Sequence, residues 1–241
     1  ERHPQYGQEM LEAIAEFRPA VAALLRLGLP IGGAFLVDVT AFTFMALFIA
    51  RLGATMSAAH QVAANLAVLC FMLPLAIGHA ALVLAGHALG AGDPAGARHA
   101  GVAGLAVGGT VACVISAGLW LGADALVAIY TSDAEVRRLA ASLVAIIAFY
   151  HFADAFQAVA VNVLRGYKKT TVPMMIYAVS LWGLGLGGGY VLGLTDWLGP
   201  ARGAAGFWLA ATASPVLAGV LVIAYFLRVS QNALAPAATS T

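Results

Sequence analysis

The chain has 241 residues, of which 62% are hydrophobic and only 10% are charged, and its mean hydropathy is +0.91. A soluble fold of this size cannot hide so much apolar side chain, because even a 300-residue globule buries only about three quarters of its unfolded surface. This excludes a soluble enzyme, and a formal net charge of +1 offers no basic field for nucleic acid. The excess apolar surface is therefore expected to face lipid.

The first 26 residues are predicted to form a cytoplasmic linker. Acidic side chains are interspersed with apolar ones in residues 9–18, which is typical of a short amphipathic helix at a membrane interface. The chain opens at Glu1 without an initiator Met or a signal-peptide pattern, which indicates a processed or partial chain.

Six membrane spans are predicted after the linker. A helix needs about 20 mostly apolar residues to cross the hydrocarbon layer. Windows with at most one Asp, Glu, Lys or Arg give six crossings, at about 27–50, 58–89, 99–123, 139–164, 170–195 and 203–227. The fold class is therefore an all-α membrane protein.

The connections between spans carry helix-start and helix-stop signals. Asp93 before Pro94 is expected to cap the third span, and Asp133 is expected to cap the fourth. Pro74 should bend the second span, because proline removes one N–H from the helical ladder. The tail at 229–241, rich in Ala, Ser, Thr and Pro, is predicted to be disordered.

The distribution of basic residues predicts the orientation in the membrane. If residues 1–26 are cytoplasmic, eight Lys and Arg lie on that side and four lie on the other. Because cytoplasmic loops carry the excess of Lys and Arg, both ends of the chain are expected to be cytoplasmic.

Two acidic residues, Asp38 and Asp154, lie near the middle of the first and fourth spans. A charged side chain at the bilayer centre costs about 2.5–3.5 kcal/mol on insertion scales. An unpaired acid at that depth either lines a wet cavity or stays protonated, because desolvation disfavours the charged form. Either outcome suits a group that picks up and releases a cation.

The neighbours of Asp154 on its helix are polar. Positions three and four apart share a helix face, so Tyr150, His151, Asp154 and Gln157 are predicted to form one polar stripe. Such a stripe should face a cavity or another helix rather than lipid. The alternative is a purely structural cluster of hydrogen bonds between helices.

The neighbours of Asp38 on its helix are apolar and include the aromatic residues Phe35 and Phe42. An acid beside aromatic rings suits an organic cation, through charge and cation–π attraction. The alternative is an acid hydrogen-bonded to a backbone carbonyl beside core aromatics.

A glycine pattern in the fifth span matches the dinucleotide fingerprint Gly183-x-Gly185-x-x-Gly188. No strand precedes it and no βαβ unit surrounds it, so a nucleotide site is not expected. These glycines are predicted to let helices approach closely.

Four histidines could suggest a metal site within the membrane: His60, His79, His87 and His151. Their spacing matches no metal-binding motif. We therefore expect no metal site beyond a coupling Na⁺, no cofactor and no catalytic residue.

Eight short motifs, in order, resemble the second half of a MATE-family multidrug and toxin extrusion transporter of the NorM-type branch. The resemblance covers about residues 1–230. The motifs are GLPIG at 28–32, AAHQVA at 58–63, LPLAIG at 73–78, ALGAGDP at 88–94, SD at 132–133, DAFQ at 154–157, RG at 165–166 with TVPM at 171–174, and GAAGFW at 203–208.

The resemblance implies a twelve-helix transporter of two six-helix lobes, with the substrate cavity between them. This chain would supply the C-terminal lobe, and the N-terminal lobe would come from another fragment or chain. Asp38 and Asp154 match acidic positions implicated in binding the coupling cation, Na⁺ or H⁺, and Tyr150 matches an aromatic position beside the second acid. Asp38 stands where the branch commonly has glutamate, and Lys168 with Lys169 replaces a commoner Gly-Asp pair.

We therefore expect a cation-coupled antiporter in the bacterial inner membrane that exports amphipathic organic cations by alternating access. The expected substrate cavity includes Phe35, Phe42, His151 and Gln157 beside the two acids. One alternative is a flippase for lipid-linked oligosaccharides, which should carry basic residues in its cavity to meet phosphate. Others are an intramembrane metalloenzyme using His79, His87 and acids, and a non-catalytic scaffold.

Overall fold

The computed structural model describes the backbone of residues 4–235 and the side chains from residue 17 onward. Within this part, six helical segments are long and apolar enough to cross a membrane, which confirms the predicted all-helical, six-span fold class. The helices are α1 (Pro4–Ala50), α2 (Ala54–Gly90), α3 (Pro94–Tyr130), α4 (Ala134–Gly166), α5 (Thr171–Ala178), the π-helix η1 (Val179–Gly187), α6 (Gly188–Leu194) and α7 (Ala204–Leu234).

The two predicted helix caps are present. The Asp93 carboxylate accepts a hydrogen bond from the backbone N–H of Gly96 at 2.8 Å, and Pro94 occupies the first turn of α3. The Asp133 carboxylate accepts from the N–H groups of Glu135 and Val136, both at 2.9 Å. These caps satisfy backbone donors that a helix start leaves unpaired, so α3 and α4 begin where the sequence indicates.

The first and last helices are longer than predicted. Instead of a separate amphipathic helix at 9–18, α1 runs without a break from Pro4 to Ala50. The helix α7 extends through Leu234, so residues 229–234 of the expected tail are helical. Ser230, in that extension, is fully buried and donates a hydrogen bond to the Leu227 carbonyl. Residues 236–241 lie outside the described part.

The fifth span is not one regular helix. It consists of α5, η1 and α6 in direct succession, and the middle third has π-helical hydrogen bonding. A π-turn widens the helix locally and is often found at functional sites. Within it, the indole N–H of Trp182 donates to the Val37 carbonyl of α1 at 3.2 Å.

Glycines of this span allow the close packing that the sequence predicts, but at partly different positions. A Cβ on Gly185 or Gly188 would contact Ser214 or Ala210 of α7 at 3.3–3.4 Å, whereas one on Gly183 would meet nothing within 4 Å. The closest approach to the backbone of another helix is at Gly206 of α7, where a Cβ would lie 2.6 Å from the carbonyl group of Leu192.

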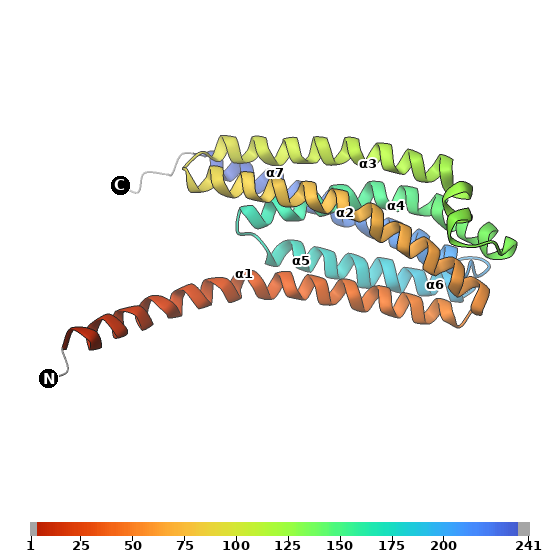
Figure 1. The fold of residues 1–241 in the computed structure, drawn as a ribbon, viewed down its shortest axis with the longest axis horizontal. Helices are drawn as coiled ribbons and strands as arrows, with labels where there is room; N and C mark the ends of the chain where they lie inside the picture. Colours follow the sequence, from red (N-terminus) through yellow and green to blue (C-terminus); the bar gives the residue numbers. More distant parts are fainter. Residues whose placement is uncertain (1–3, 236–241) are drawn as a thin grey trace.

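The helices form two groups (Figure 1). One group contains α2, α3, α4 and α7, which pack tightly around α4. The other contains α1 alongside α5, η1 and α6, and in this second group η1 and α6 also pack closely against α7. The loops that join α1 to α2 and α3 to α4 lie at one end of the molecule, opposite the described ends of the chain.

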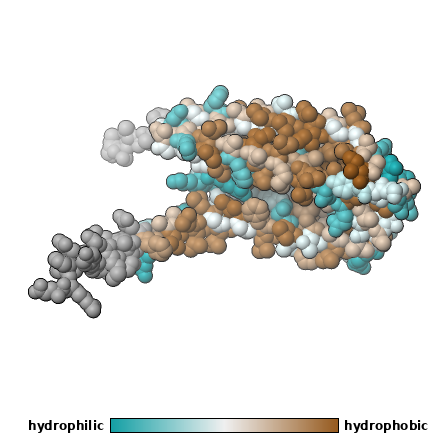
Figure 2. All heavy atoms as spheres, viewed as in Figure 1, coloured by the Kyte–Doolittle hydropathy of each residue, from teal (hydrophilic) through white to brown (hydrophobic). Residues whose placement is uncertain are grey.

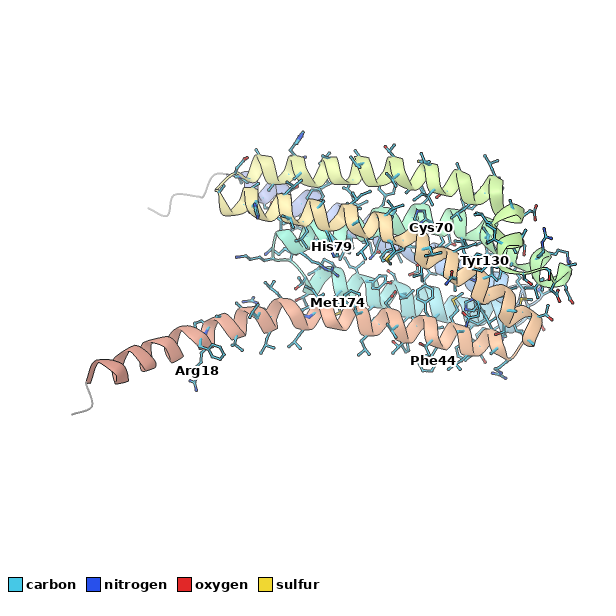
Figure 3. The ribbon with its side chains drawn as sticks, viewed as in Figure 1. Arg18, Phe44, Cys70, His79, Tyr130 and Met174 are labelled. Carbon is cyan, nitrogen blue, oxygen red and sulfur yellow. The ribbon has the colours of Figure 1, made fainter. Side chains whose placement is uncertain are left out.

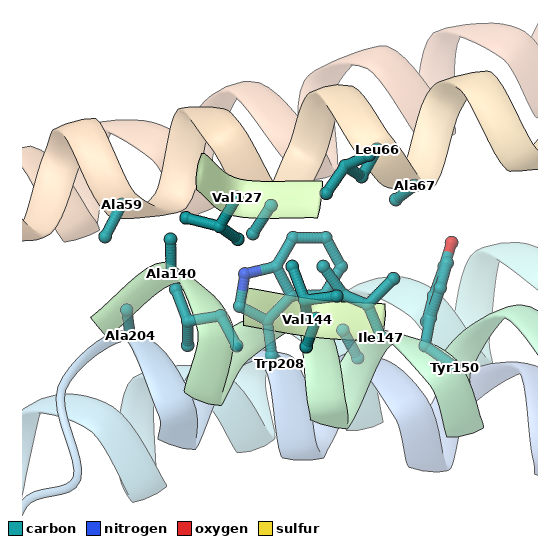
Figure 4. Packing of buried hydrophobic residues seen from close by; sticks show 14 of the residues in the cluster. Ala59, Leu66, Ala67, Val127, Ala140, Val144, Ile147, Tyr150, Ala204 and Trp208 are labelled. Atoms are coloured by element: carbon teal, nitrogen blue, oxygen red, sulfur yellow. The ribbon is translucent and has the colours of Figure 1, made fainter. Parts of the chain in front are cut away.

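The largest core cluster joins the two groups at the end that holds the α1–α2 loop. It is built around Trp208, which is fully buried against Val144 and Ile147 of α4 (Figure 4), and α1 contributes Met45 and Ile49. A second core cluster at the opposite end draws its buried residues from α2, α3, α4, the α4–α5 loop and α7, and includes no residue of α1 among those described. The helix α1 therefore packs into the core at one end of the bundle, and a cavity lies beside it toward the other end.

Candidate functional site

A cavity of about 520 Å³ lies between α1 and α5 on one side and α2 and α4 on the other. The space-filling view shows a hollow between the two helix groups, with hydrophilic atoms inside and mostly hydrophobic atoms around it (Figure 2). In the side-chain view, Met174 of α5 lies beside this hollow, whereas Phe44 and Arg18 of α1 point away from it (Figure 3).

The two mid-span acids come from different helices and line this same cavity. Asp38 projects from α1 and Asp154 from α4, where it is 6% exposed. The Tyr177 hydroxyl of α5 donates a hydrogen bond to the Asp38 carboxylate. The partner of Asp38 is thus a tyrosine rather than the backbone carbonyl of the alternative interpretation.

A layer of aromatic rings lies next to the two acids. Phe42 and Tyr150 are each four residues from an acid, in the direction of the end that holds the α1–α2 and α3–α4 loops. Their ring centroids lie 6.5 Å apart, and those of Tyr150 and Trp208 lie 5.7 Å apart in an edge-to-face arrangement. The Trp208 indole N–H donates to Nδ1 of His60 at 3.3 Å. This aromatic layer (Phe42, Tyr150, Trp208 and His60) lines the cavity toward that end.

Six of the seven predicted site residues line the cavity: Phe35, Asp38, Phe42, Tyr150, Asp154 and Gln157. The prediction for His151 was wrong, because its side chain is 1% exposed and does not line the cavity. Adjacent residues of an α-helix point about 100° apart, so His151 cannot share the direction of Tyr150. The polar stripe of α4 is therefore Tyr150, Asp154 and Gln157.

Sequence reasoning missed several cavity residues. Asn162 continues the Asp154 stripe at eight residues' distance and Arg165 at eleven, so the stripe itself could have revealed them. Tyr177 and Trp208 come from other helices. Nothing in the sequence indicates that α5 and α7 would bring these two side chains to the acids.

The end of the cavity away from the aromatic layer carries basic side chains. Arg165 and Lys169, at the α4–α5 connection, both line it. The Arg165 guanidinium donates to the Asn162 side-chain oxygen at 3.0 Å. The cavity thus has an acidic region and a basic region, which we call the basic end (Arg165 and Lys169).

The histidines that the structure describes do not come together in a metal site. Among the described residues, no group of three or more His, Cys, Asp or Glu side chains could hold a metal ion. His79 and His87 are both exposed on α2, away from the cavity lining. The donor set required by the metalloenzyme alternative is not assembled in this part of the chain.

Comparisons with known proteins give one consistent family. The MatE family model matches residues 30–191. A protein named "Probable multidrug resistance protein NorM" from Aromatoleum aromaticum is 44% identical over 218 residues, which cover 88% of this chain and 46% of that protein. One of the same name from Idiomarina loihiensis is 41% identical over 212 residues, with the same coverage. The chain therefore spans about half the length of these curated relatives.

Solved structures give the same fold. A crystal structure of the Vibrio cholerae MATE transporter VcmN in its bent form matches with a TM-score of 0.79 at 18% sequence identity. The match covers 90% of this chain and 48% of that one. At this identity the likeness establishes the fold alone.

Proposed function

The chain belongs to the MatE family of transporters, and from this premise we propose that it forms one lobe of a cation-coupled antiporter for organic cations. It is an integral membrane protein with six helical segments of spanning length. Its curated relatives are named multidrug resistance proteins, and the family is one of transporters rather than enzymes. The proposed substrates are amphipathic organic cations, and the proposed coupling ion is Na⁺ or H⁺.

One observation carries the proposal: carboxylates from two separate helices line a single cavity whose walls are otherwise mostly apolar. Asp38 and Asp154 supply negative charge, and Phe35, Phe42 and Tyr150 supply aromatic surface around them. An amphipathic cation needs both, because the rings attract its charge and cover its apolar body. A non-catalytic scaffold would gain nothing from two acids placed at this depth.

The proposed mechanism is competition between drug and coupling ion for the two carboxylates. When the cavity is open to the outside, Na⁺ or H⁺ neutralises Asp154 and Asp38, and the bound drug leaves. Reorientation then opens the cavity to the inside, where the ion departs and a new drug molecule binds. A ligand shifts such an equilibrium only through different affinities for the two states, so loss of the acid should uncouple transport.

Reorientation requires a second lobe. Because the chain spans about half the length of its curated relatives, we propose that an N-terminal six-helix lobe, on a separate fragment or chain, closes the other side of the cavity. Rocking of the two lobes about the cavity then gives alternating access.

The experiment that tests this function is efflux by a complete transporter containing this chain and carrying Asp154→Asn. The amide keeps the size of the side chain but cannot carry the charge that attracts cations. We expect cells with the variant to lose cation-driven efflux of rhodamine 6G, while the amount of protein in the membrane stays close to that of the wild type.

A matched control removes an acid elsewhere in the same way. Asp124 lies exposed on α3 and outside the cavity lining, so Asp124→Asn should leave efflux unchanged. Undiminished efflux by Asp154→Asn would refute the assignment.

The lipid-linked oligosaccharide flippase remains the second candidate, because the basic end supplies two cationic side chains. Arg165 and Lys169 lie at one end only, however, and the centre of the cavity is held by carboxylates. A diphosphate group passing through that centre would be repelled by both acids. The cavity therefore supports a cationic substrate better than a purely anionic one.

A further inference from the structure

His60 and Trp208 form a buried pair in the aromatic layer. The indole N–H of Trp208 donates to Nδ1 of His60 at 3.3 Å, and the centroids of the two rings lie 5.8 Å apart. His60 is 3% exposed and Trp208 is fully buried. Both side chains line the cavity that contains the two acids. Their hydrogen bond therefore lies within the wall of the candidate site.

The direction of this hydrogen bond fixes the protonation state of His60. An indole nitrogen can only donate, so Nδ1 of His60 must accept and carries no proton. A neutral imidazole has one protonated ring nitrogen, which in His60 is then Nε2. A second proton on Nδ1 would set two N–H groups against each other and break the bond to Trp208. The pair thus holds His60 as the neutral tautomer with its proton on Nε2.

The packing of Trp208 keeps its N–H at this position. The indole lies edge to face with Tyr150, and its centroid is 6.3 Å from that of Phe42. It also packs against Val144 and Ile147 of α4 (Figure 4). In a close-packed core, a ring of this size turns only if its neighbours move. The donor is therefore held at Nδ1 of His60 by the core itself.

The other histidine buried beside the cavity helices has no such partner. His151 is 1% exposed, and its Nε2 is sealed in the interior without a hydrogen bond. Its side chain does not line the cavity. A hydrogen bond from tryptophan is thus not a general requirement of buried histidines in this lobe, and it occurs at the histidine that shares a cavity with the acids.

The charge of His60 matters because of the groups that face the same cavity. The charged or titratable side chains in the lining, besides His60, are Asp38 of α1, Tyr150, Asp154 and Arg165 of α4, Lys169 of the α4–α5 connection and Tyr177 of α5. Arg165 and Lys169 lie at the basic end, away from the aromatic layer. A second proton on His60 would place a positive charge in the half of the cavity that holds the two carboxylates. Mobile cations would then have to compete with an internal counter-ion.

We infer that Trp208 is a positioning residue: its indole N–H holds His60 neutral, so that Asp38 and Asp154 stay available to mobile cations. The inference deepens the proposed function and rests on it, because it explains how the two acids remain without an internal counter-ion. The tautomer of His60 can be measured whether or not the protein transports cations.

The first measurement is the protonation state of His60 in a purified complete transporter that contains this chain. Nitrogen NMR of protein with ¹⁵N-labelled histidine distinguishes protonated from bare ring nitrogens, and loss of signals in His60→Gln identifies those of His60. At pH 6 we expect a bare Nδ1 and a protonated Nε2 in the wild type. In Trp208→Phe we expect mostly two protonated nitrogens, because an imidazole ordinarily gains its second proton near about pH 6.5. A doubly protonated His60 in the wild type would overturn the inference.

The second measurement is the binding of rhodamine 6G to the same transporter in nanodiscs at pH 8 and pH 6. When the pH falls, the dissociation constant should rise about tenfold more in Trp208→Phe than in the wild type, because an imidazolium then opposes the charge of the dye at the acids. Adding His60→Gln should abolish this excess, since glutamine gains no proton in this range. General damage from the smaller ring at Trp208 would persist in that double variant.

Trp120 of α3 provides a matched control for the loss of an indole. Its side chain is 52% exposed and lies outside the cavity lining. Trp120→Phe should therefore follow the wild type in its pH dependence of dye binding.

The outcomes separate the inference from the function on which it rests. If the dye binds but Trp208→Phe shows the pH dependence of the wild type, or if the excess remains after His60→Gln, the inference is wrong and the cation site stands. If the dye binds the wild type at neither pH, the proposed function fails, and the part of the inference that concerns the acids fails with it. If Trp208→Phe does not fold, the NMR spectrum of the wild type at pH 6 decides whether His60 is held neutral.

Discussion

The two cavity carboxylates have different surroundings, which gives them different parts in the proposed exchange. Asp38 accepts a hydrogen bond from Tyr177 and so links α1 to α5. No hydrogen bond from the described residues reaches the carboxylate of Asp154, although it lines the cavity. We therefore propose that Asp154 is the acid that a mobile cation meets directly, whereas Asp38 also links α1 to α5.

The link between Asp38 and Tyr177 should be measurable as an interaction energy. Tyr177→Phe removes the donor and Asp38→Asn weakens the acceptor. Because both changes act on the same contact, their effects on the free energy of unfolding should be non-additive by about 1 kcal/mol. Thermal unfolding of the two single variants and the double variant in detergent gives this value.

Tyr190 of α6 provides the matched control, since it lies thirteen residues further along the same span. Tyr190→Phe combined with Asp38→Asn should be additive. Additivity of the Tyr177 pair as well would show that the hydrogen bond contributes nothing to holding α1 against α5.

At the level of single residues, the sequence predicted the acids and their helix-mates but not their partners across the cavity. Asp38 and Asp154 could be identified because a charge inside an apolar span is costly wherever it occurs. Phe42 and Gln157 followed from helical spacing alone. The contact of Tyr177 with Asp38 could not be predicted, because nothing in the sequence of α5 indicates that the Tyr177 hydroxyl faces α1. The prediction for His151 was wrong because adjacent residues of an α-helix point about 100° apart, so consecutive polar residues do not share one face.

Among the elements, helix contacts in this lobe depend on glycine at particular points. A Cβ on Gly206 of α7 would lie 2.6 Å from the backbone carbonyl of Leu192, whereas one on Gly183 would meet nothing within 4 Å. Backbone cannot move aside as a side-chain tip can, so Gly206→Ala should destabilise the protein by about 1–3 kcal/mol. Gly183→Ala should be neutral or slightly stabilising, because alanine favours a helix over glycine.

Thermal unfolding of the two variants in the same detergent tests this pair. Equal melting temperatures for Gly206→Ala and wild type would contradict the close approach of α7 to the end of α6.

The membrane-spanning helices were largely predictable, because a span can be recognised from the composition of its own segment of the sequence. The windows with at most one charged residue found all six spans, and Asp93 and Asp133 marked the starts of α3 and α4. Five of the six windows were shorter than the helices because helices continue into polar surroundings, as α3 does to Tyr130. The π-helix could not be predicted, since its wider turn depends on packing against α1 and α7 rather than on apolar periodicity.

For the whole molecule, an even number of spans places both ends of the chain on one side of the membrane. Basic residues favour the cytoplasm for that side. Figure 1 places the α2–α3 and α4–α5 connections at the same end as the described termini, and the α3–α4 connection at the opposite end. The basic end of the cavity therefore faces the cytoplasm in this orientation.

Cysteine labelling tests the orientation. After replacement of the native Cys70 and Cys113, a membrane-impermeant maleimide added to intact spheroplasts should label Ser132→Cys in the α3–α4 loop. It should label Ala95→Cys at the start of α3 only after permeabilisation. Both positions are exposed, so the reverse pattern would invert the orientation.

In the proposed mechanism, coupling ions and organic cations share the carboxylates of one cavity. The most direct measurement is displacement of rhodamine 6G from a purified complete transporter containing this chain, in nanodiscs, by Na⁺ at fixed pH and by H⁺ at fixed Na⁺, for the wild type, Asp154→Asn and Asp124→Asn. We predict that one of the two ions releases the dye from the wild type and from Asp124→Asn but has little effect on the dye that Asp154→Asn still binds. Equal release from all three proteins, or no release by either ion, would contradict the account.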